Sequence, residues 1–252
     1  MTILHAIATT ASILALTAAT AAAPATGSVR NIVLVHGAFA DGSGWKAVAD
    51  ILKADGYSVS VVQQPMTSIA DDVAATIRVL DMQSGPAVLV GHSYGGAVIT
   101  EAGDHANVAS LVFVAAFAPD EGEALGALSG SIPSAAHSIA PTTDGYLFVD
   151  PAQFPADFAA DLPADLAEFM AVSQMPINGQ IWGTPIAAPA WKVKPSYAIL
   201  TTKDRMINPD LQRSMYDRAK SEITEIAGSH AVFLSQPQAV ADVIEAAAQA
   251  TQ

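Results

Sequence analysis

A serine stands between glycines in the stretch GHSYGG at residues 91–96. Gly91, Ser93 and Gly95 fit the pattern G-x-S-x-G, in which a sharp turn from a strand into a helix exposes the serine hydroxyl. The glycines are required because such a turn presses these positions against neighbouring backbone. The helix that follows points its N-terminal end at the serine oxygen and favours a negative charge developing there. A glycine-rich turn with an incidental serine is the alternative, but pattern, strand and helix coincide here, so we predict that Ser93 is a nucleophile.

A serine hydroxyl is a weak nucleophile near neutral pH and needs a base. The chain order nucleophile, acid, histidine leaves the histidines after Ser93 as candidates, namely His105, His137 and His230. We predict His230, because it follows the last predicted strand and so lies at the sheet edge that also carries the serine. His105 and His137 are expected to be solvated. His92 lies inside the turn, where it packs or lines the pocket but is too local to act as the base.

The acid of such a triad accepts the second imidazole N–H and fixes the histidine tautomer. Asp204 fits this role, because the predicted strand SYAILT runs directly towards it and a capped helix follows. Asp120 and Glu121, which follow an earlier predicted strand, compete for the same role. We favour Asp204 because it completes a pattern of strand, acid and helix.

The negatively charged oxygen of the transition state needs two N–H donors at the same sheet edge. Tyr94, the residue after the nucleophile, is predicted to supply one. The other is expected from the loop after the first strand, where the stretch HGAF offers Ala38 as the predicted donor and Phe39 as the alternative.

The elements that must position these residues follow from hydrophobic periodicity. Short apolar runs alternate with segments of helical period, which predicts an α/β fold with a mostly parallel sheet and helices on both faces. The runs are continuous, which indicates strands buried on both sides. The six predicted strands span residues 31–36, 58–63, 86–91, 109–115, 196–201 and 222–226. The predicted helices span residues 45–55, 68–81, 94–104, 208–219 and 237–250, with N-terminal caps at Ser68 and Asn208.

Residues 120–190 break this alternation, because they are rich in Pro, Ala, Asp and aromatic residues and offer helical fragments without a good strand. A loose surface excursion is one reading. A long insertion between two strands is more often a lid or a binding wall. We therefore predict a small helical cap inserted into a single domain that spans residues 30–252.

The charge and composition of the chain exclude several classes of function. The 252 residues include 11 basic and 24 acidic side chains, for a net charge of -13. This charge repels phosphate backbones and anionic lipids, so no nucleic-acid partner is expected. The absence of cysteine excludes disulfides, thiolate nucleophiles and thiolate metal sites. The histidines are scattered without ligand spacing, so no metal site is expected.

Residues 1–29 contain no Asp, Glu, Lys or Arg. Their apolar centre and the following run Ala21-Ala22-Ala23 fit a secretory signal peptide with a small-residue cleavage site, which predicts a periplasmic or secreted protein. The start of the chain lacks the basic residues of such signals. A cytoplasmic location and an N-terminal anchor therefore stay open as alternatives.

The stretches IVLVHGAFADGSGW, VLVGHSYGG, TTKDR and GSHAVFLSQP resemble the α/β-hydrolase superfamily, in particular short bacterial esterases similar to plant methylesterases and hydroxynitrile lyases. The resemblance covers residues 31–250 and implies an α/β-hydrolase fold with a helical cap, no cofactor, and an acyl-enzyme on Ser93. Two departures argue against lyase chemistry, because the resembling lyases have threonine in place of Gly37 and lysine in place of Ala231. Dehalogenases of the superfamily are also disfavoured, since they have an aspartate in place of Ser93.

The sequence therefore predicts a carboxylesterase-type serine hydrolase that cleaves small to medium carboxylic esters through Ser93, Asp204 and His230. A lactonase or a cofactor-free perhydrolase with the same triad is one alternative. A non-catalytic ligand receptor on the same fold is another. The expected partner is a small-molecule ester, and no stable membrane insertion is expected.

Overall fold

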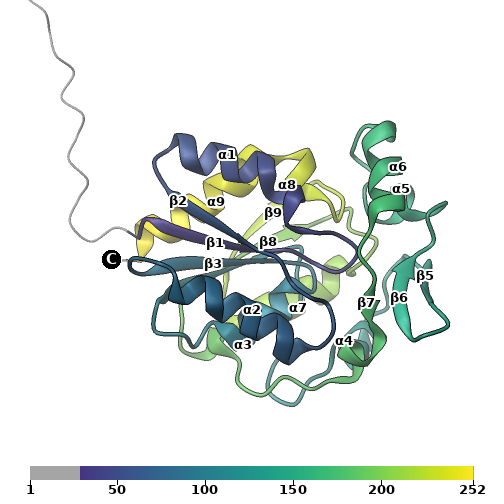
Figure 1. The fold of residues 1–252 in the computed structure, drawn as a ribbon, viewed down its shortest axis with the longest axis horizontal. Coiled ribbons are helices and arrows are strands. Elements are labelled where there is room, and N and C mark those ends of the chain that lie inside the picture. The colour runs from purple at the N-terminus through teal and green to yellow at the C-terminus, as the bar shows by residue number, and fades with distance from the viewer. Residues whose placement is uncertain (1–28, 252) are drawn as a thin grey trace, which may run out of the picture.

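The computed structural model describes residues 29–251 and centres on a six-stranded sheet (Figure 1). The strands follow the order β2-β1-β3-β4-β8-β9, and every pairing between neighbours is parallel. The apolar runs of β1 and β3 are buried along their whole length, as expected for strands covered on both faces. The expectation was wrong for β2 and β9, which are largely exposed or half-buried because they form the two edges of the sheet. The strand bounds agree with the predictions to within one residue at each end: β1 Asn31–Val35, β2 Ser58–Val62, β3 Ala87–His92, β4 Val108–Val114, β8 Ser196–Thr201 and β9 Glu222–Ile226.

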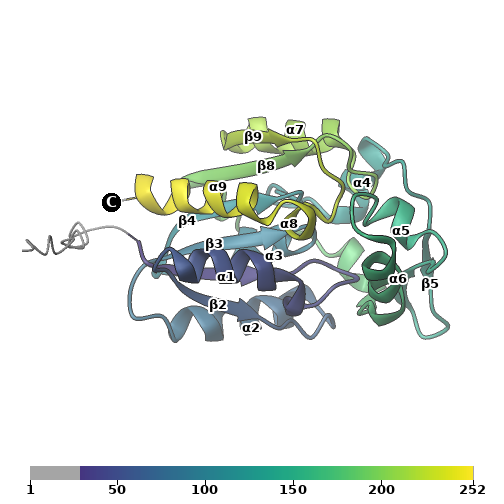
Figure 2. The ribbon, with the colours of Figure 1, turned by 90° about the horizontal axis from the view of Figure 1, so that it is seen from above.

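Helices cover both faces of this sheet (Figures 1 and 2). One face carries α1 (Lys46–Ala54), α8 (Val232–Ser235) and α9 (Pro237–Ala250), together with the short 3-10 helix η1 (Gly42–Trp45). The other face carries α2 (Ile69–Asp81), α3 (Gly95–Ala102) and α7 (Pro209–Ala219). The predicted caps are present, because the Ser68 side chain accepts the N–H of Asp71 at 3.1 Å and the Asn208 side chain accepts that of Asp210 at 2.9 Å. The six-stranded parallel sheet with helices on both faces confirms the predicted architecture.

Residues 120–190 form a cap at one end of the sheet, on the right in Figures 1 and 2. The cap contains the expected helices and also an antiparallel sheet in the order β5-β6-β7, so the expectation of a cap without strands was wrong. These strands are two to four residues long and only partly buried, and therefore lack the apolar run that identifies the strands of the main sheet. The cap elements are α4 Leu125–Ser131, β5 Ile139–Pro141, β6 Tyr146–Val149, α5 Phe154–Asp157, α6 Ala164–Ser173, β7 Ile177–Asn178, η2 Gly179–Gly183 and η3 Ala190–Lys192.

The core of the cap is continuous with the core of the main domain. Phe154, Phe158 and Ile177 of the cap are fully buried in the same hydrophobic cluster as Val35 and Leu89 of the sheet. A second cluster fills the opposite face of the sheet beneath α1 and α9. The cap therefore packs as part of the domain, and its contacts reach the loops at the ends of the strands.

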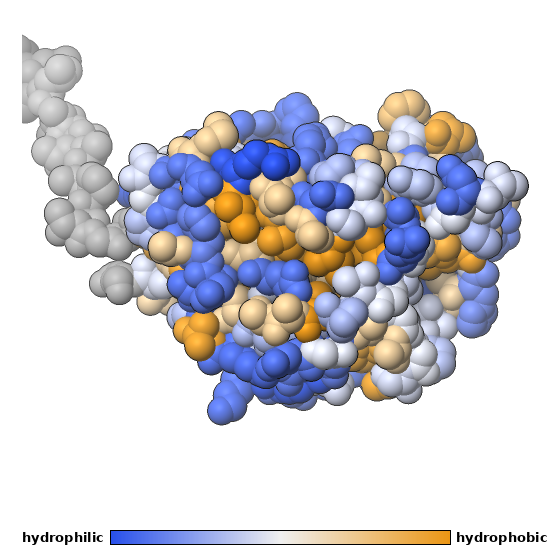
Figure 3. All heavy atoms as spheres, turned by 60° about the horizontal axis from the view of Figure 1, so that its bottom comes forward, coloured by the Kyte–Doolittle hydropathy of each residue, from blue (hydrophilic) through white to orange (hydrophobic). Residues whose placement is uncertain are grey.

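The predicted leader lies almost wholly outside the described residues. Its last residue, Val29, is described and is 2% exposed within the core, so the folded domain includes at least one residue assigned to the leader. Among residues 29–251, the helices are too short or too polar to cross a lipid bilayer. Figure 3 shows hydrophilic residues over much of the face at the bottom of Figure 1, interrupted by a band of hydrophobic ones.

Candidate active site

Ser93 lies on a strained turn between β3 and α3. Its φ of 53° is in the left-handed region, which a residue with a side chain adopts only when the surroundings impose it. A Cβ on Gly91 would lie 2.5 Å from the carbonyl oxygen of Gly95, and one on Gly95 would lie 2.7 Å from that of His36. Both glycines are therefore in direct contact with backbone, as the spacing of the motif predicts, and the turn is specified by sequence.

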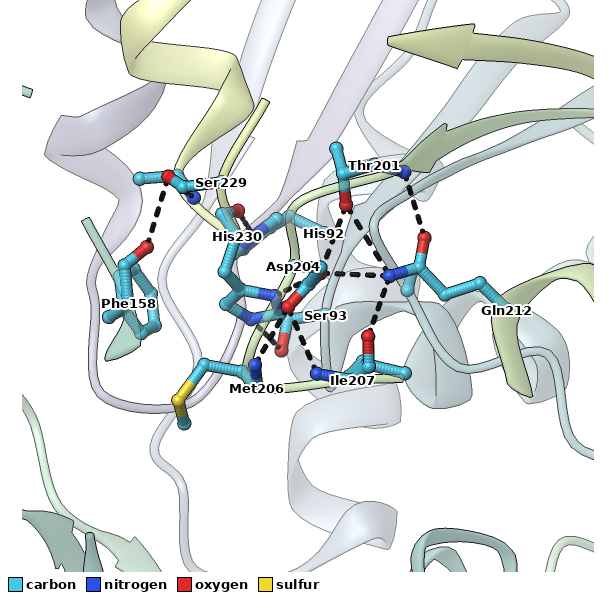
Figure 4. A network of polar contacts seen from close by, with 12 residues as sticks. His92, Ser93, Phe158, Thr201, Asp204, Met206, Ile207, Gln212, Ser229 and His230 are labelled. Carbon is cyan, nitrogen blue, oxygen red and sulfur yellow. Dashed lines mark hydrogen bonds and ion pairs between the residues drawn. The ribbon is translucent and has the colours of Figure 1, made fainter. Parts of the chain in front are cut away.

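The structure brings the three residues of the predicted triad together. Nδ1 of His230 lies 2.8 Å from Oδ2 of Asp204, and Nε2 lies 2.8 Å from Oγ of Ser93 (Figure 4). The carboxylate can only accept, so Nδ1 carries a proton and Nε2 of the neutral ring accepts the serine hydroxyl. Ser93, Asp204 and His230 are 7%, 4% and 1% exposed. The burial excludes most water from the array and strengthens its electrostatic interactions.

Asp204 receives hydrogen bonds from several donors besides His230. Oδ1 accepts the backbone N–H groups of Met206 and Ile207 at 2.8 and 3.0 Å. Oδ2 accepts the hydroxyl of Thr201 at 3.0 Å and the side-chain amide of Gln212 at 2.8 Å. Hydrogen bonds of this kind fix the orientation of the carboxylate towards His230.

Gln212 is a site residue that the sequence analysis did not identify. Its side chain is fully buried on α7, donates to Asp204 and to the carbonyl of Ile207 at 3.0 Å, and accepts the N–H of Thr201 at 3.1 Å. The available signal was a glutamine on the apolar face of the helix, beside Leu211 and Met215. A buried amide at such a position needs polar partners.

The predicted oxyanion donors lie on either side of the nucleophile. Among the described residues, neither the N–H of Tyr94 nor that of Ala38 donates a backbone hydrogen bond. The N–H of Phe39 donates to the carbonyl of Met175 in the cap at 3.2 Å. This bond occupies the alternative donor and favours the pair Ala38 and Tyr94.

His36 fixes the loop that carries Ala38. Its Nε2 accepts the N–H of Gln64 at 3.2 Å, so the proton resides on Nδ1, which donates to the carbonyl of Gly37 at 2.9 Å. Burial lowers the pKa of His36, which keeps the ring neutral as this pair of bonds requires. The side chain of Gln64 donates to the carbonyl of His36 at 2.6 Å and closes the arrangement.

His92 packs behind the catalytic histidine. Its Nε2 donates to the backbone carbonyl of His230 at 2.9 Å, and its ring lies among those of Trp45, Phe233 and His230. Burial first, and the neighbouring His230 second, lower the pKa of His92 well below its ordinary value. Of the two roles expected for His92, the structure shows the packing role.

The competing candidates lie away from this array. His105 pairs with Asp81 at 3.1 Å, and His137 lies on the surface of the cap. Asp120 forms an ion pair with Lys192 at the base of the cap, and Glu121 is exposed beside it. None of these four alternative residues therefore lies at Ser93.

Comparison with known proteins fixes the family of this chain. The profile of a family described as "Alpha/beta hydrolase family" matches residues 32–243, which include the whole candidate site. The chain belongs to the alpha/beta hydrolase family. The predicted resemblance and the predicted α/β-hydrolase fold are thereby confirmed.

Individual members of the alpha/beta hydrolase family show how far the similarity extends. A pyrethroid hydrolase of Sphingobium wenxiniae is 26% identical over 245 residues, 86% of this chain and 87% of that protein. A carbendazim hydrolyzing esterase of Nocardioides is 34% identical over 112 residues, and this match spans less than half, 46%, of that protein's length. The crystal structure of a pyrethroid hydrolase from Sphingobium faniae superposes with a TM-score of 0.77 at 24% identity, over 88% of this chain and 98% of that one.

Proposed function

We propose that this chain is a carboxylic ester hydrolase that works through an acyl-enzyme on Ser93. The observation that carries the proposal is the unbroken hydrogen-bonded array from Ser93 through His230 to Asp204, with 2.8 Å at each step. In this array His230 takes the proton of the Ser93 hydroxyl as the oxygen attacks an ester carbonyl. The former carbonyl oxygen becomes the oxyanion of a tetrahedral intermediate, and the N–H groups of Ala38 and Tyr94 stabilise it.

The same groups complete the acylation of Ser93 and then carry out its deacylation. His230 gives its proton to the leaving alcohol as the ester C–O bond breaks, and then takes a proton from the water molecule that attacks the acyl-enzyme. It returns this proton to Oγ of Ser93 as the bond between that oxygen and the acyl carbon breaks and the carboxylic acid leaves. Asp204 stays ionised throughout and stabilises the imidazolium, a role that its four further hydrogen bonds support. The names of the related proteins, a pyrethroid hydrolase and a carbendazim hydrolyzing esterase, support hydrolysis as the reaction class.

Position 37 argues for hydrolysis over lyase chemistry. A Cβ on Gly37 would lie 2.6 Å from Cβ of Ser93 and 2.9 Å from Nδ1 of His92. The threonine that the resembling lyases carry at this position would need the turn itself to shift. The loop at Gly37 is therefore packed too closely against the turn of Ser93 to hold the polar side chain of the resembling lyases.

An apolar groove of about 160 Å³ supports an ester with a hydrophobic group as substrate. It runs between α6 and the loop after β1, and Phe39, which lines it, directly follows the proposed donor Ala38. Most of the larger lining side chains are hydrophobic, including Leu166, Phe169, Met170, Phe233 and Leu234. Such a lining favours an apolar acyl or alcohol group.

The test is hydrolysis of a series of p-nitrophenyl esters from acetate to decanoate by the full chain and its Ser93→Ala variant. We expect repeated turnover by the wild type and loss of about 10⁶-fold in kcat in the variant, because the nucleophile is removed. A fluorophosphonate probe should label the wild type alone. The preferred chain length will then report how much of the groove the substrate fills.

Equal and slow hydrolysis by both folded proteins would contradict the proposal. A single labelling event without turnover would favour the receptor alternative. Turnover of γ-lactones, or of acetate with peroxide, at rates above those of the esters would instead favour the lactonase or perhydrolase alternative.

A further inference from the structure

The backbone around His230 is held by groups from outside its own loop. The N–H of Ser229, the residue before it, donates to Oδ2 of Asp161 at 2.8 Å. The N–H of Ala231, the residue after it, donates to the carbonyl of Phe158 at 3.0 Å. Both acceptors belong to the cap. His230 therefore lies between two residues whose backbone N–H groups are both bonded to the cap, the insertion that the sequence predicts as a lid or binding wall.

Asp161 is hydrogen-bonded to both ends of the segment that carries His230, residues 229–235, here called the histidine segment. Its carboxylate accepts the hydroxyl of Ser229 as well as the N–H of that residue, and it accepts the hydroxyl of Ser235 at 2.9 Å. Burial acts to raise the pKa of Asp161, but the hydrogen bonds from Ser229 and Ser235 outweigh it and hold the pKa below its usual value. The ionised carboxylate is an acceptor at every oxygen, which all three donors need.

Phe158 restrains the imidazole itself. Its ring meets that of His230 edge-on, with centroids 4.8 Å apart and planes at 83°, and it stacks on Phe154 at 4.7 Å. Figure 4 shows Phe158 beside Ser229 and His230. Both phenylalanines are fully buried. The ring of His230 thus packs against Phe158 of the cap, the residue whose carbonyl also accepts the N–H of Ala231.

We propose that Asp161 is a positioning residue for His230, through which the cap sets the geometry of the chemical step. This inference rests on the proposed function and extends it. An amide at position 161 would present a donor to at least one of the groups that now donate to the carboxylate, and so would lose a bond on the histidine segment. Small displacements of a catalytic base cost rate far more than they cost binding.

The test compares Asp161→Asn with Asp165→Asn, which removes the same charge from an exposed carboxylate of the same cap. For hydrolysis of p-nitrophenyl acetate we expect kcat of Asp161→Asn to fall about tenfold to a hundredfold with KM within about twofold of wild type. The control should keep both constants. Proton NMR adds a readout independent of any substrate, since the signal of the His230 Nδ1–H should broaden in Asp161→Asn and stay sharp in the control.

Unchanged kcat and an unchanged proton signal in Asp161→Asn would overturn the inference, as would a loss confined to KM. If Asp161→Asn fails to fold, Ser235→Ala serves instead, because it removes the bond from Ser235 to the Asp161 carboxylate. We expect a smaller loss of kcat in Ser235→Ala. Wild-type kinetics in Ser235→Ala would then overturn the inference. If the wild type itself cleaves no ester, the proposed function fails. The proton signal then still decides whether Asp161 orders His230.

Discussion

The hydroxyl of Tyr94 donates a 2.6 Å hydrogen bond to Oδ2 of Asp72, and neither side chain is exposed to solvent. The other carboxylate oxygen of Asp72 accepts the N–H of Met66 at 2.9 Å. Burial raises the pKa of Asp72, and the bond from Tyr94 offsets part of that rise. The residue that carries a proposed oxyanion donor is therefore anchored through its side chain to α2.

This anchor predicts the behaviour of Tyr94→Phe. The substitution leaves a buried carboxylate oxygen without its donor, which should lower the free energy of unfolding by about 1–3 kcal/mol. Because the Tyr94 N–H stays in the chain, kcat should fall by less than the roughly 10²–10³ that loss of an oxyanion donor costs. Urea unfolding and steady-state kinetics measure the two effects. Adding Asp72→Asn should recover part of the stability, and no recovery would show that the carboxylate is not the cause.

The donors around Asp204 predict a large effect of Asp204→Asn. If the asparagine NH₂ took the place of Oδ1, it would face the two backbone N–H groups of Met206 and Ile207. If it took the place of Oδ2, it would face the amide of Gln212 and could not accept the Nδ1–H of His230. We expect kcat for p-nitrophenyl acetate to fall by about 10⁴, because the histidine tautomer is lost. Asp120→Asn is the matched control and should stay within about twofold of wild type, since a surface ion pair contributes little. Equal losses in both variants would refute the assignment of the acid.

Two buried histidines predict acid-sensitive stability. Burial lowers the pKa of both His36 and His92, so the unfolded chain binds more protons than the folded protein once the pH falls below the ordinary value of 6.5. Their contribution to stability is complete above pH 6.5 and is lost as the pH falls through the lowered folded values, by at most about 1.4 kcal/mol per pH unit for each histidine. Urea unfolding between pH 5 and 8 tests this, and His92→Phe should flatten the slope. A slope identical in wild type and variant would speak against a buried neutral His92.

The groove predicts an effect of Phe169→Ser that depends on the substrate. The Phe169 ring is 65% exposed at the edge of the groove, so its removal should leave folding intact. For p-nitrophenyl decanoate we expect KM to rise about threefold to tenfold, the equivalent of about 1 kcal/mol of lost apolar contact, with no change for the acetate. Val193→Ser removes a comparably exposed apolar side chain outside the groove and should change neither. A rise of KM for both esters would mean that Phe169 acts on the site as a whole.

The main sheet and the triad were predictable because their signals are local. A continuous apolar run such as that of β3 predicts a buried strand by itself, and Ser93 and Asp204 follow the buried strands β3 and β8 directly or after a short loop. His230 follows the more exposed edge strand β9 after a short loop. Parallel strands bring their carboxyl ends to one edge, which assembles the three residues without any knowledge of distances.

What the sequence did not predict depends on contacts between distant segments. The pairing of Asp161 with Ser229 spans 68 residues, and nothing in either stretch marks the partner. The strands of the cap are too short to show a period, and the role of Gln212 depends on which loop α7 packs against. These features follow from tertiary packing, for which a single sequence carries only indirect signals.

The shared core of cap and sheet limits how this site can be altered. A cap taken from another alpha/beta hydrolase would have to match the buried faces of Phe154 and Phe158 and, at the same time, hold the loop of His230. The cap therefore cannot be exchanged independently of the main domain. Redesign of substrate range is better directed at its outer helix α6, where Phe169 and Leu166 can change without moving the histidine.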